Sequence, residues 1–346
     1  MRVRLRPARH RMIITSHAYA RAGLIGNPSD GYYGKTISFV IRNFKATVCL
    51  WESPHFEIVP TQGDLARFGS VGEFVRDVKL HGYYGGIRLI KASVKKFHEY
   101  CGKQNIDLDK RSFTVSVETD IPRLVGMSGS SAIITAMFKA MMKFYGVDIP
   151  KHYLPTLVLA AEREELAINA GLQDRVIQVY EGIVYMDFER QHLEQHGYGM
   201  YEELRPKKMP PLYVAYDVER AEVSDIPHKN LRQLFEKGDP TVVGAMQTYR
   251  EITDRARVAL MAGDWGTLGR AMDENFDLRK TFMPIAPENQ RMIDVARATG
   301  ASAKFTGSGG AICGLYKDGK QYQQLVDALA SIRCNVIRPI IFETHA

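Results

Sequence analysis

One serine- and glycine-rich segment, residues 121–132 (IPRLVGMSGSSA), has residue types suited to binding a phosphate. Glycines let backbone N–H groups approach an anion closely, and the helix expected directly afterwards points its unpaired N–H groups and positive dipole end to the same place. A serine hydroxyl there can also ligate the magnesium that accompanies a nucleotide. Helix capping would account for one serine but not for this cluster, and a Walker A loop is excluded because no Gly-Lys-Ser/Thr occurs. The predicted phosphate-binding residues are Gly126, Ser128, Gly129, Ser130 and Ser131.

Two further segments are rich in glycine. The turn at 304–311 (KFTGSGGA) lies between two expected strands, where successive backbone amides can form an anion-binding nest. A tight hairpin connection explains the same residues equally well. The segment 20–30 (ARAGLIGNPSD) leads from an expected N-terminal strand into a turn-rich region. In the turn at 304–311, the residues placed to meet a phosphate are Gly307, Ser308, Gly309 and Gly310.

Carboxylates that could do acid–base or metal chemistry follow the serine-rich loop in the chain. Glu162 lies with Glu164 and Glu165 on an expected helix, and Asp174 follows in a Gly-Leu-Gln-Asp-Arg turn. A solvated helix face explains most glutamates, and the N-cap of a short helix explains an aspartate at such a turn. The local pattern alone therefore favours structural roles for both groups.

The elements that must position these loops mix strands and helices without a strict strand–helix–strand rhythm. Val, Ile, Phe and Thr are dense in 37–50, and 113–117 alternates between apolar and polar residues, as strands do. A helical pattern after the serines stops at Gly146, a frequent kind of helix terminator. Further strands are expected at 183–188 and 212–216, further helices at 86–100, 154–169 and between 229 and 299, and strand, turn, strand, helix and strand over 303–341. This mixture predicts an α+β fold in two lobes.

Composition argues against several other classes of protein. The chain has 346 residues, of which 45% are hydrophobic and 25% charged, as in an ordinary globular enzyme. Its net charge of +7 comes mainly from five arginines in residues 1–11, so no nucleic-acid partner is expected. No stretch reaches about 18 uncharged apolar residues, so no membrane partner is expected either. The four cysteines, Cys49, Cys101, Cys313 and Cys334, form no CxxC pair and indicate reduced thiols in a cytoplasmic protein.

Taken in order, the three loops resemble the three motifs of the GHMP (galactokinase/homoserine kinase/mevalonate kinase/phosphomevalonate kinase) superfamily. Residues 20–30 are similar to the galactokinase-type segment in which Leu-Ile-Gly is followed by Asp. Residues 121–132 resemble the Pro-x-x-x-Gly-Leu-(Gly/Ser)-Ser-Ser-Ala loop, and 304–311 the terminal Thr-Gly-(Ser/Ala)-Gly-Gly loop. The resemblance spans about residues 14–341.

Within that superfamily the chain looks most like the glucuronokinases. The likeness is carried by AR-x-G-x-x-GNPSD-x-Y (20–32), GYYGG-x-RL (82–89), the Gly-x-Ser-Gly-Ser-Ser-Ala form of the second loop, AGLQDRV-x-QVY (170–180) and KFTGSGGA (304–311). The implied activity is ATP-dependent phosphorylation of D-glucuronate at its anomeric hydroxyl, which gives glucuronate 1-phosphate for nucleotide-sugar (UDP-glucuronate) synthesis. The alternatives are a kinase for galacturonate, galactose or a heptose, and a non-catalytic sensor on the same fold.

The resemblance also implies a domain plan. Residues 12–200 would be an N-terminal, ATP-binding lobe like the second domain of ribosomal protein S5, and 201–346 a ferredoxin-like C-terminal lobe. The polar stretch 189–210 is the expected boundary, and 1–11 is expected to be a disordered basic tail. ATP and the sugar would meet between the lobes, with Mg²⁺ as the cofactor.

Roles for individual residues follow from the same resemblance. Asp174 would be the catalytic base and Arg21 its partner, while Glu162 and Ser131 would hold Mg²⁺. The Gly-Met-Ser-Gly-Ser-Ser form is one residue longer than the loop of mevalonate kinase, so Ser130 is kept as the alternative to Ser131 as the metal ligand. Residues expected to contact the sugar are Asp30 at its hydroxyls, and Lys35, Arg88 and Arg175 as alternatives for its C6 carboxylate, a group that bidentate arginine reads well.

Overall fold

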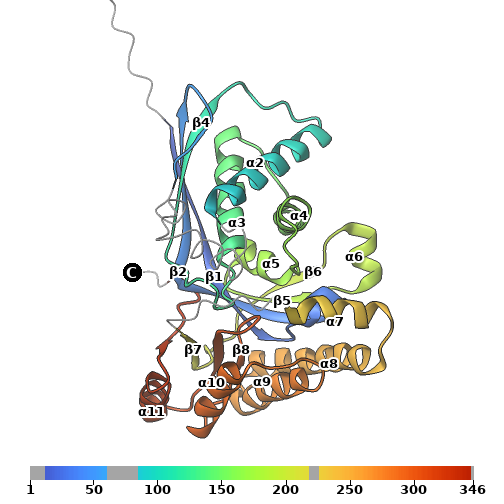
Figure 1. Ribbon diagram of the computed structural model, residues 1–346, viewed down its shortest axis with the longest axis vertical. Helices are drawn as coiled ribbons and strands as arrows, with labels where there is room; N and C mark the ends of the chain where they lie inside the picture. Colours follow the sequence, from blue (N-terminus) through green and yellow to red (C-terminus); the bar gives the residue numbers. More distant parts are fainter. Residues whose placement is uncertain (1–11, 61–84, 218–225, 344–346) are drawn as a thin grey trace, which may run out of the picture.

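Two long strands frame the first lobe of the computed structural model, which describes residues 12–60, 85–217 and 226–343 (Figure 1). β1 (Ile13–Ile25) pairs antiparallel with β2 (Lys35–Ser53), with Ala18 opposite Ala46 and Arg21 opposite Val40. The first half of β1 alternates between buried and less buried residues, whereas its last six residues are all buried. The strand therefore begins as one edge of a half-covered sheet and ends between the lobes.

Neighbouring strands extend this sheet on the other side of β2. β4 (Ser112–Thr119) pairs with the C-terminal half of β2, and β5 (Ile183–Asp187) pairs with its N-terminal half. β3 (Glu57–Ile58) joins β4 in parallel, and β6 (Met200–Leu204) joins β5 antiparallel. Within the described residues the sheet has six strands, and the strands predicted over 37–50, 113–117 and 183–188 are confirmed.

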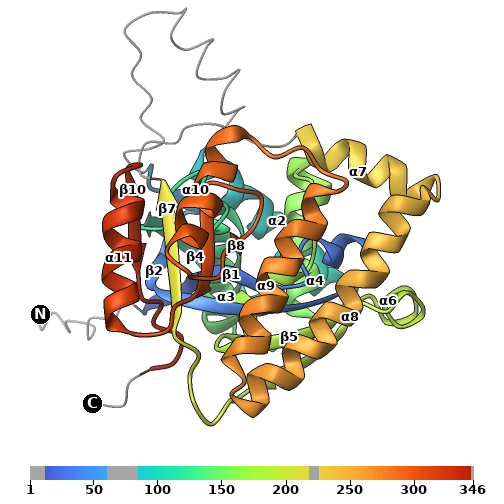
Figure 2. The ribbon, with the colours of Figure 1, turned by 90° about the horizontal axis from the view of Figure 1, so that it is seen from below.

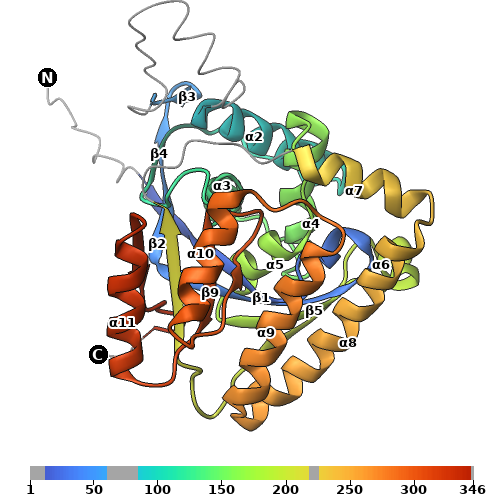
Figure 3. The same ribbon diagram turned by 60° about the horizontal axis from the view of Figure 1, so that its bottom comes forward.

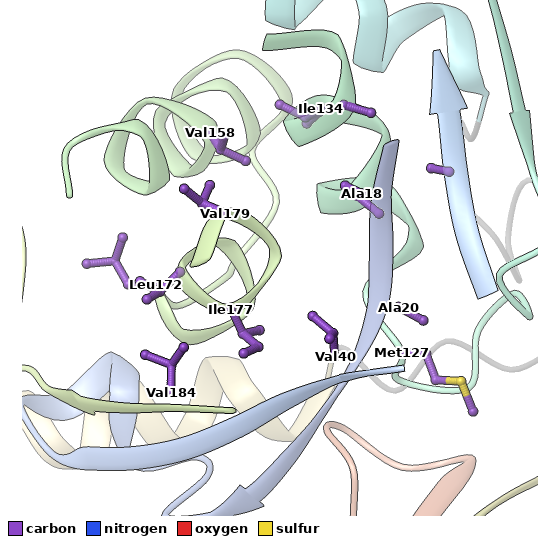
Figure 4. Packing of buried hydrophobic residues seen from close by; sticks show 14 of the residues in the cluster. Ala18, Ala20, Val40, Met127, Ile134, Val158, Leu172, Ile177, Val179 and Val184 are labelled. Atoms are coloured by element: carbon purple, nitrogen blue, oxygen red, sulfur yellow. The ribbon is translucent and has the colours of Figure 1, made fainter. Parts of the chain in front are cut away.

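Four helices cover one face of this sheet, and all but the third of them carry predicted site residues (Figure 1). They are α2 (Gly86–Lys103), α3 (Gly129–Tyr145), α4 (Leu154–Ala160) and α5 (Gln173–Tyr180). Figure 4 shows Ala18 and Ala20 of β1 with Ile134 of α3 and Ile177 of α5, and all four side chains are fully buried. The alanines let α3 lie close to β1, and each large buried side chain contributes about 1.5–3 kcal/mol.

The second lobe contains a four-stranded sheet in the order β10-β7-β9-β8, counted over the described residues. Its strands are β7 (Leu212–Asp217), β8 (Lys304–Phe305), β9 (Ala311–Leu315) and β10 (Cys334–Ile337). Figure 2 shows the helices of this lobe: α8 (Pro240–Ala262), α9 (Trp265–Lys280), α10 (Pro287–Ala298) and α11 (Gly319–Ala330). The last three pack against the sheet, whereas α8 packs against α9 and β2. The prediction of a two-lobed α+β fold is confirmed.

Three segments differ from the sequence-based expectation. The stretch 189–210 contains α6 (Arg190–His196) and β6, and because β6 pairs with β5, the chain enters the second sheet only after Leu204. The helix expected over 154–169 stops at Ala160 and continues as one π-turn, η2 (Ala161–Glu165). Such turns often occur at functional sites.

The end of the described chain returns to the first lobe instead of extending its last strand to 341. β10 ends at Ile337, and the backbone N–H of Arg42 donates to the carbonyl of Ile340 at 2.8 Å. Residues 1–11, the expected basic tail, lie outside the described residues. None of the described helices is long and apolar enough to cross a membrane, and none of the four cysteines is bonded to another.

Candidate active site

A cavity of about 880 Å³ lies between the lobes, lined by described residues from both. Part of η1 (Ser29–Tyr32), the serine-rich loop before α3 and the start of α5 face it from the first lobe. Gly307, Ser308 and Arg232 face it from the second lobe. The three glycine-rich segments of the sequence therefore border one space.

The serine-rich loop has an unusual backbone conformation. Leu124, Gly126 and Ser128 have φ angles of 60°, 67° and 62°, so the left-handed conformation recurs at every second residue. Each non-glycine residue in that conformation costs about 1–2 kcal/mol, and alternating handedness of this kind builds N–H concavities. A side chain at Gly126 is excluded because its Cβ would lie 2.9 Å from the carbonyl oxygen of Gly309.

The three serines of this loop have different partners. Ser128 does not cap α3: its hydroxyl donates to Asp174 Oδ2 at 2.5 Å. Ser130 donates to Glu162 Oε1 at 3.2 Å, whereas the buried Ser131 hydroxyl donates to the carbonyl of Ser128 at 3.1 Å. Of the two serines left open as metal ligands, Ser130 is thus the one beside the carboxylate.

The turn at 304–311 presents only part of its length to the cavity. Gly307 and Ser308 line it, whereas Gly309 and Gly310 do not, and the Gly310 N–H already donates to Asn289 Oδ1 at 3.0 Å. The predicted phosphate contact is therefore narrowed to Gly307 and Ser308. Arg279 stabilises the turn, because it donates to the Gly307 carbonyl at 2.9 Å.

Arg21 connects the two glycine-rich loops to the predicted catalytic carboxylate. Its Nε donates to Asp174 Oδ1 at 2.5 Å, and its Nη1 donates to the carbonyls of Gly126 at 2.6 Å and Thr306 at 3.1 Å. Because Arg21 lies in the fully buried half of β1, the main sheet fixes this arrangement. The family resemblance predicted that Arg21 is the partner of Asp174, and the two side chains are in contact in the structure.

Asp174 is held in its ionised form. It is the second residue of α5 and does not act as an N-cap, because its carboxylate accepts from Arg21, from Ser128 and, at 3.2 Å, from Arg175 Nη1. Burial alone would raise the pKa of Asp174, but the charges of Arg21 and Arg175 outweigh it and lower that pKa to about 2. A carboxylate has about four lone-pair sites, so these three donors leave one for a substrate hydroxyl.

Glu162 lies in the π-turn and is completely buried, unlike Glu164 and Glu165. Its Oε2 accepts from Arg175 Nε at 2.5 Å and its Oε1 from Ser130. Glu164 and Glu165 instead pair with lysines of α2, as a solvated helix face would. Glu162 does not line the cavity, but its Oε1 lies 3.2 Å from the Ser130 hydroxyl, which does. Two oxygen ligands suit Mg²⁺, which seldom has an all-protein cage. No cluster of three or more His, Cys, Asp or Glu suited to a metal occurs among the described residues.

Asp30 lines the same cavity as the serine-rich loop and has the opposite electrostatics to Asp174. Its oxygens accept from the backbone N–H of Gln173 at 3.3 Å and from Gln173 Nε2 at 3.2 Å. Burial, and then the nearby charge of Asp174, raise the pKa of Asp30 to about 7. Gly171 must be glycine here, since a Cβ would lie 2.0 Å from Asp30 Oδ2.

The three cationic residues predicted to bind a sugar carboxylate differ in whether they line the cavity. Lys35 does not line the cavity and pairs with Asp254 at 2.7 Å, so it is not retained as a substrate ligand. Arg88 is in the first turn of α2 but is also not a lining residue, although Leu89 beside it is. Arg175 does line the cavity, but Glu162 and Asp174 already occupy its guanidinium.

Several residues at the site were missed from sequence. Gln173 was read only as part of a turn, and its role as the donor to Asp30 depends on tertiary contact. Arg123 and Arg232 line the cavity, yet no short motif distinguishes them. Lys304 could have been noticed because it directly precedes the glycine-rich turn; it is buried and donates to Asn27 Oδ1 at 2.6 Å.

Sequence profiles of two domain families match this chain. The family described as GHMP kinases N terminal domain matches residues 88–182, and the family described as GHMP kinases C terminal matches 256–335. The first match contains α2, the serine-rich loop, Glu162 and Asp174, and the second contains the turn at 304–311.

Full-length relatives extend the likeness to nearly all of the sequence. The chain is 39% identical over 320 residues to Glucuronokinase 1 of Arabidopsis thaliana, covering 91% of this chain and 88% of that protein. It is also 39% identical over 335 residues to Probable glucuronokinase 2 of Arabidopsis thaliana, covering 95% and 91%. In fold it matches a crystal structure of Lactococcus lactis galactokinase complexed with galactose, with a TM-score of 0.75, 13% identity, and coverage of 95% of this chain and 93% of that one.

Proposed function

Because the chain belongs to the GHMP kinase family, we propose that it is an ATP-dependent sugar 1-kinase that phosphorylates the anomeric hydroxyl of D-glucuronate. The product, glucuronate 1-phosphate, would serve nucleotide-sugar (UDP-glucuronate) synthesis. The observation that carries the proposal is the 39% identity to Glucuronokinase 1 across 91% of this chain. The ionised Asp174, placed between the two glycine-rich loops by Arg21, supports catalysis over a sensor role.

The loops bind the nucleotide in this account. The left-handed loop at 124–128 and the N-terminus of α3 direct N–H groups at the β- and γ-phosphates, and Gly307 and Ser308 close on them from the second lobe. Apolar lining residues such as Leu89, Val117 and Ile133 provide a surface for the adenine base. Phosphoryl transfer needs mainly this positioning and charge stabilisation.

Asp174 orients the acceptor. Its remaining lone pair accepts a hydrogen bond from the anomeric hydroxyl. Its carboxylate takes the proton as the new O–P bond forms and the bond from the γ-phosphorus to the bridging oxygen breaks, so that ADP leaves. With a pKa of about 2, Asp174 is a weak base. The proton therefore leaves late, after bond formation to phosphorus has begun, as a loose transition state permits. Arg21 is a positioning residue that keeps the carboxylate ionised and aimed.

Ser130 and Glu162 are the residues that would hold Mg²⁺, since their oxygens are 3.2 Å apart at the start of α3. When bound, the ion neutralises charge on the transferring phosphate. Arg175 holds the second oxygen of Glu162 and keeps that carboxylate in place.

An ATP-consumption assay over a panel of sugars tests the proposal. It should include glucuronate, galacturonate, galactose, glucose and a heptose at equal concentrations. The highest kcat/KM is expected for glucuronate. A higher value for another sugar would support the alternative sugar kinases, and no turnover with any sugar would support a sensor.

A further inference from the structure

Arginine is the only cationic residue type among the described residues that line the cavity, and it occurs there four times. Arg21 and Arg175 are occupied, because Asp174 binds the first and both Glu162 and Asp174 bind the second. The other two are Arg123, which is exposed on the serine-rich loop, and Arg232, which belongs to α7 (Ile226–Glu236). An anionic acceptor needs a cation that the protein has not already neutralised.

Apolar contacts hold α7 against the part of the cavity that Asp30, Tyr32 and Gln173 line, which we call the acceptor end. Leu231 is buried in a cluster with Tyr32, and Phe235 packs edge-on against Tyr32 with ring centroids 5.1 Å apart. These two positions are one helical turn apart, so Arg232 lies beside the anchored stripe. Tyr32 and Arg232 both line the cavity, and Figure 3 shows α7 beside the first lobe's helices.

The guanidinium of Arg232 has one weak partner. Its only ion pair in the described chain is with Glu236, 3.8 Å away, and that carboxylate has 63% of its side chain exposed. Another arginine lies near it: the pKa of Arg163 is lowered by burial and then by the charges of Arg232 and Arg175. Like charges close together repel one another, and an anion bound beside Arg232 would relieve this repulsion.

We propose that Arg232 binds the carboxylate of the acceptor and thereby selects uronic acids over neutral sugars. This inference rests on the proposed function, and replaces Lys35, Arg88 and Arg175 with a residue on a different lobe. Asp30 and Gln173 then read the sugar hydroxyls, Asp174 the anomeric hydroxyl, and Arg232 the negative charge. Arg123 is left for the nucleotide, since it extends from the loop that holds the phosphates.

Steady-state kinetics of Arg232→Met with glucuronate and glucose test this assignment. Loss of a charge-assisted bidentate contact should lower kcat/KM for glucuronate by about 10–150-fold, with less than about a threefold loss for glucose. Arg232→Lys, which keeps the charge but not the planar fork, should fall between. Arg270→Met, which removes an exposed arginine of α9 that does not line the cavity, is the matched control and should resemble wild type.

A binding measurement without turnover separates recognition from damage. Glucuronate should raise the melting temperature of wild type and Arg270→Met but not of Arg232→Met, whereas ATP should stabilise all three. If Arg232→Met fails to fold, Arg232→Gln is measured in the same way.

The possible results separate a failure of the proposed function from a failure of the Arg232 assignment. A wild type that does not phosphorylate glucuronate overturns the proposed function. A wild type that does, with an unchanged glucuronate kcat/KM in Arg232→Met, overturns this inference alone. Equal losses for both sugars, or a glucuronate-specific loss in Arg123→Met instead, also overturn it.

Discussion

The two ends of the cavity are built in different ways. The donor end is the part of the cavity lined by the serine-rich loop and by Gly307 and Ser308. In the proposed function, backbone N–H groups of these two loops and the N-terminus of α3 bind the nucleotide phosphates there. Arg21 connects the two loops through the carbonyls of Gly126 and Thr306. At the acceptor end, side chains from separate elements converge: Asp30 from η1, Gln173 from α5 and Arg232 from α7.

This difference separates phosphate binding, which needs no particular side chain, from the choice of the sugar, which does. Backbone N–H groups bind any polyphosphate and tolerate little change, because a side chain at Gly126 would meet the opposite loop. Side chains from independent elements can be exchanged one at a time, so the acceptor end can change its substrate while the donor end stays constant. Asp174 lies where the ends meet, with Ser128 on one side and Arg175 on the other.

The largest effect is expected where the two ends join. Asp174→Asn should reduce kcat by about 10²–10⁴-fold, the usual contribution of a positioned acid–base group. ATP affinity should change little, because the phosphate loops keep their own contacts. Calorimetric ATP titration and single-turnover rates measure the two separately, with Asp109→Asn, an exposed partner of Arg111, as the control. Turnover within a few-fold of wild type would remove Asp174 from the mechanism.

A change confined to the acceptor end should affect the sugar and spare ATP. Gly171→Ala introduces a Cβ where Asp30 Oδ2 now lies 2.0 Å away, so the carboxylate must move. A shift of about 1 Å can cost about 10²-fold, and most of it should appear as a higher KM for the sugar. The control is Gly102→Ala, whose new Cβ meets nothing within 4 Å. An unchanged sugar KM would show that Asp30 does not bind the acceptor.

A change confined to the donor end should affect the metal. Ser130→Ala should raise the Mg²⁺ concentration needed for half-maximal rate by about tenfold, while the sugar KM stays the same. Ser131→Ala should have the smaller effect on Mg²⁺, because that hydroxyl is bonded to the Ser128 carbonyl. Magnesium titrations of both variants decide the assignment, and the reverse order would make Ser131 the ligand.

The smallest effect concerns stability rather than turnover. The folded-state pKa of Asp30 is about 7, well above its ordinary value. Between about pH 4 and 7 the folded protein therefore holds a proton that the unfolded chain has lost, and stability falls as pH rises, by at most about 1.4 kcal/mol per pH unit. Asp30→Asn removes this component, so the free energy of unfolding of wild type minus variant should decline from pH 5 to 7. Parallel curves would show an ordinary pKa.

The donor end could be predicted from sequence because its parts are local. The glycines, serines and following helix of 121–146 are contiguous, so composition and order were enough to place them. Asp174 and Glu162 could be placed only through the family resemblance, since their partners come from β1 and α3.

The acceptor end could not be predicted because nothing local marks it. Lys35 is adjacent in sequence to the Asp30 segment, yet its side chain points to Asp254 of α8. Arg232 lies about 200 residues from Asp30 in the chain and is brought to the cavity by Leu231 and Phe235. Tertiary packing of a helix from the other lobe has no signature in a single sequence.

The position of the phosphate on the product tests the central claim most directly, namely that the ends meet at Asp174 and present the anomeric hydroxyl to ATP. The product formed from glucuronate and ATP is analysed by phosphorus–proton coupled NMR. The account predicts one new phosphorus signal coupled to the anomeric proton, with loss of the free reducing end. A phosphorus signal coupled to another ring proton, with the reducing end intact, would contradict it.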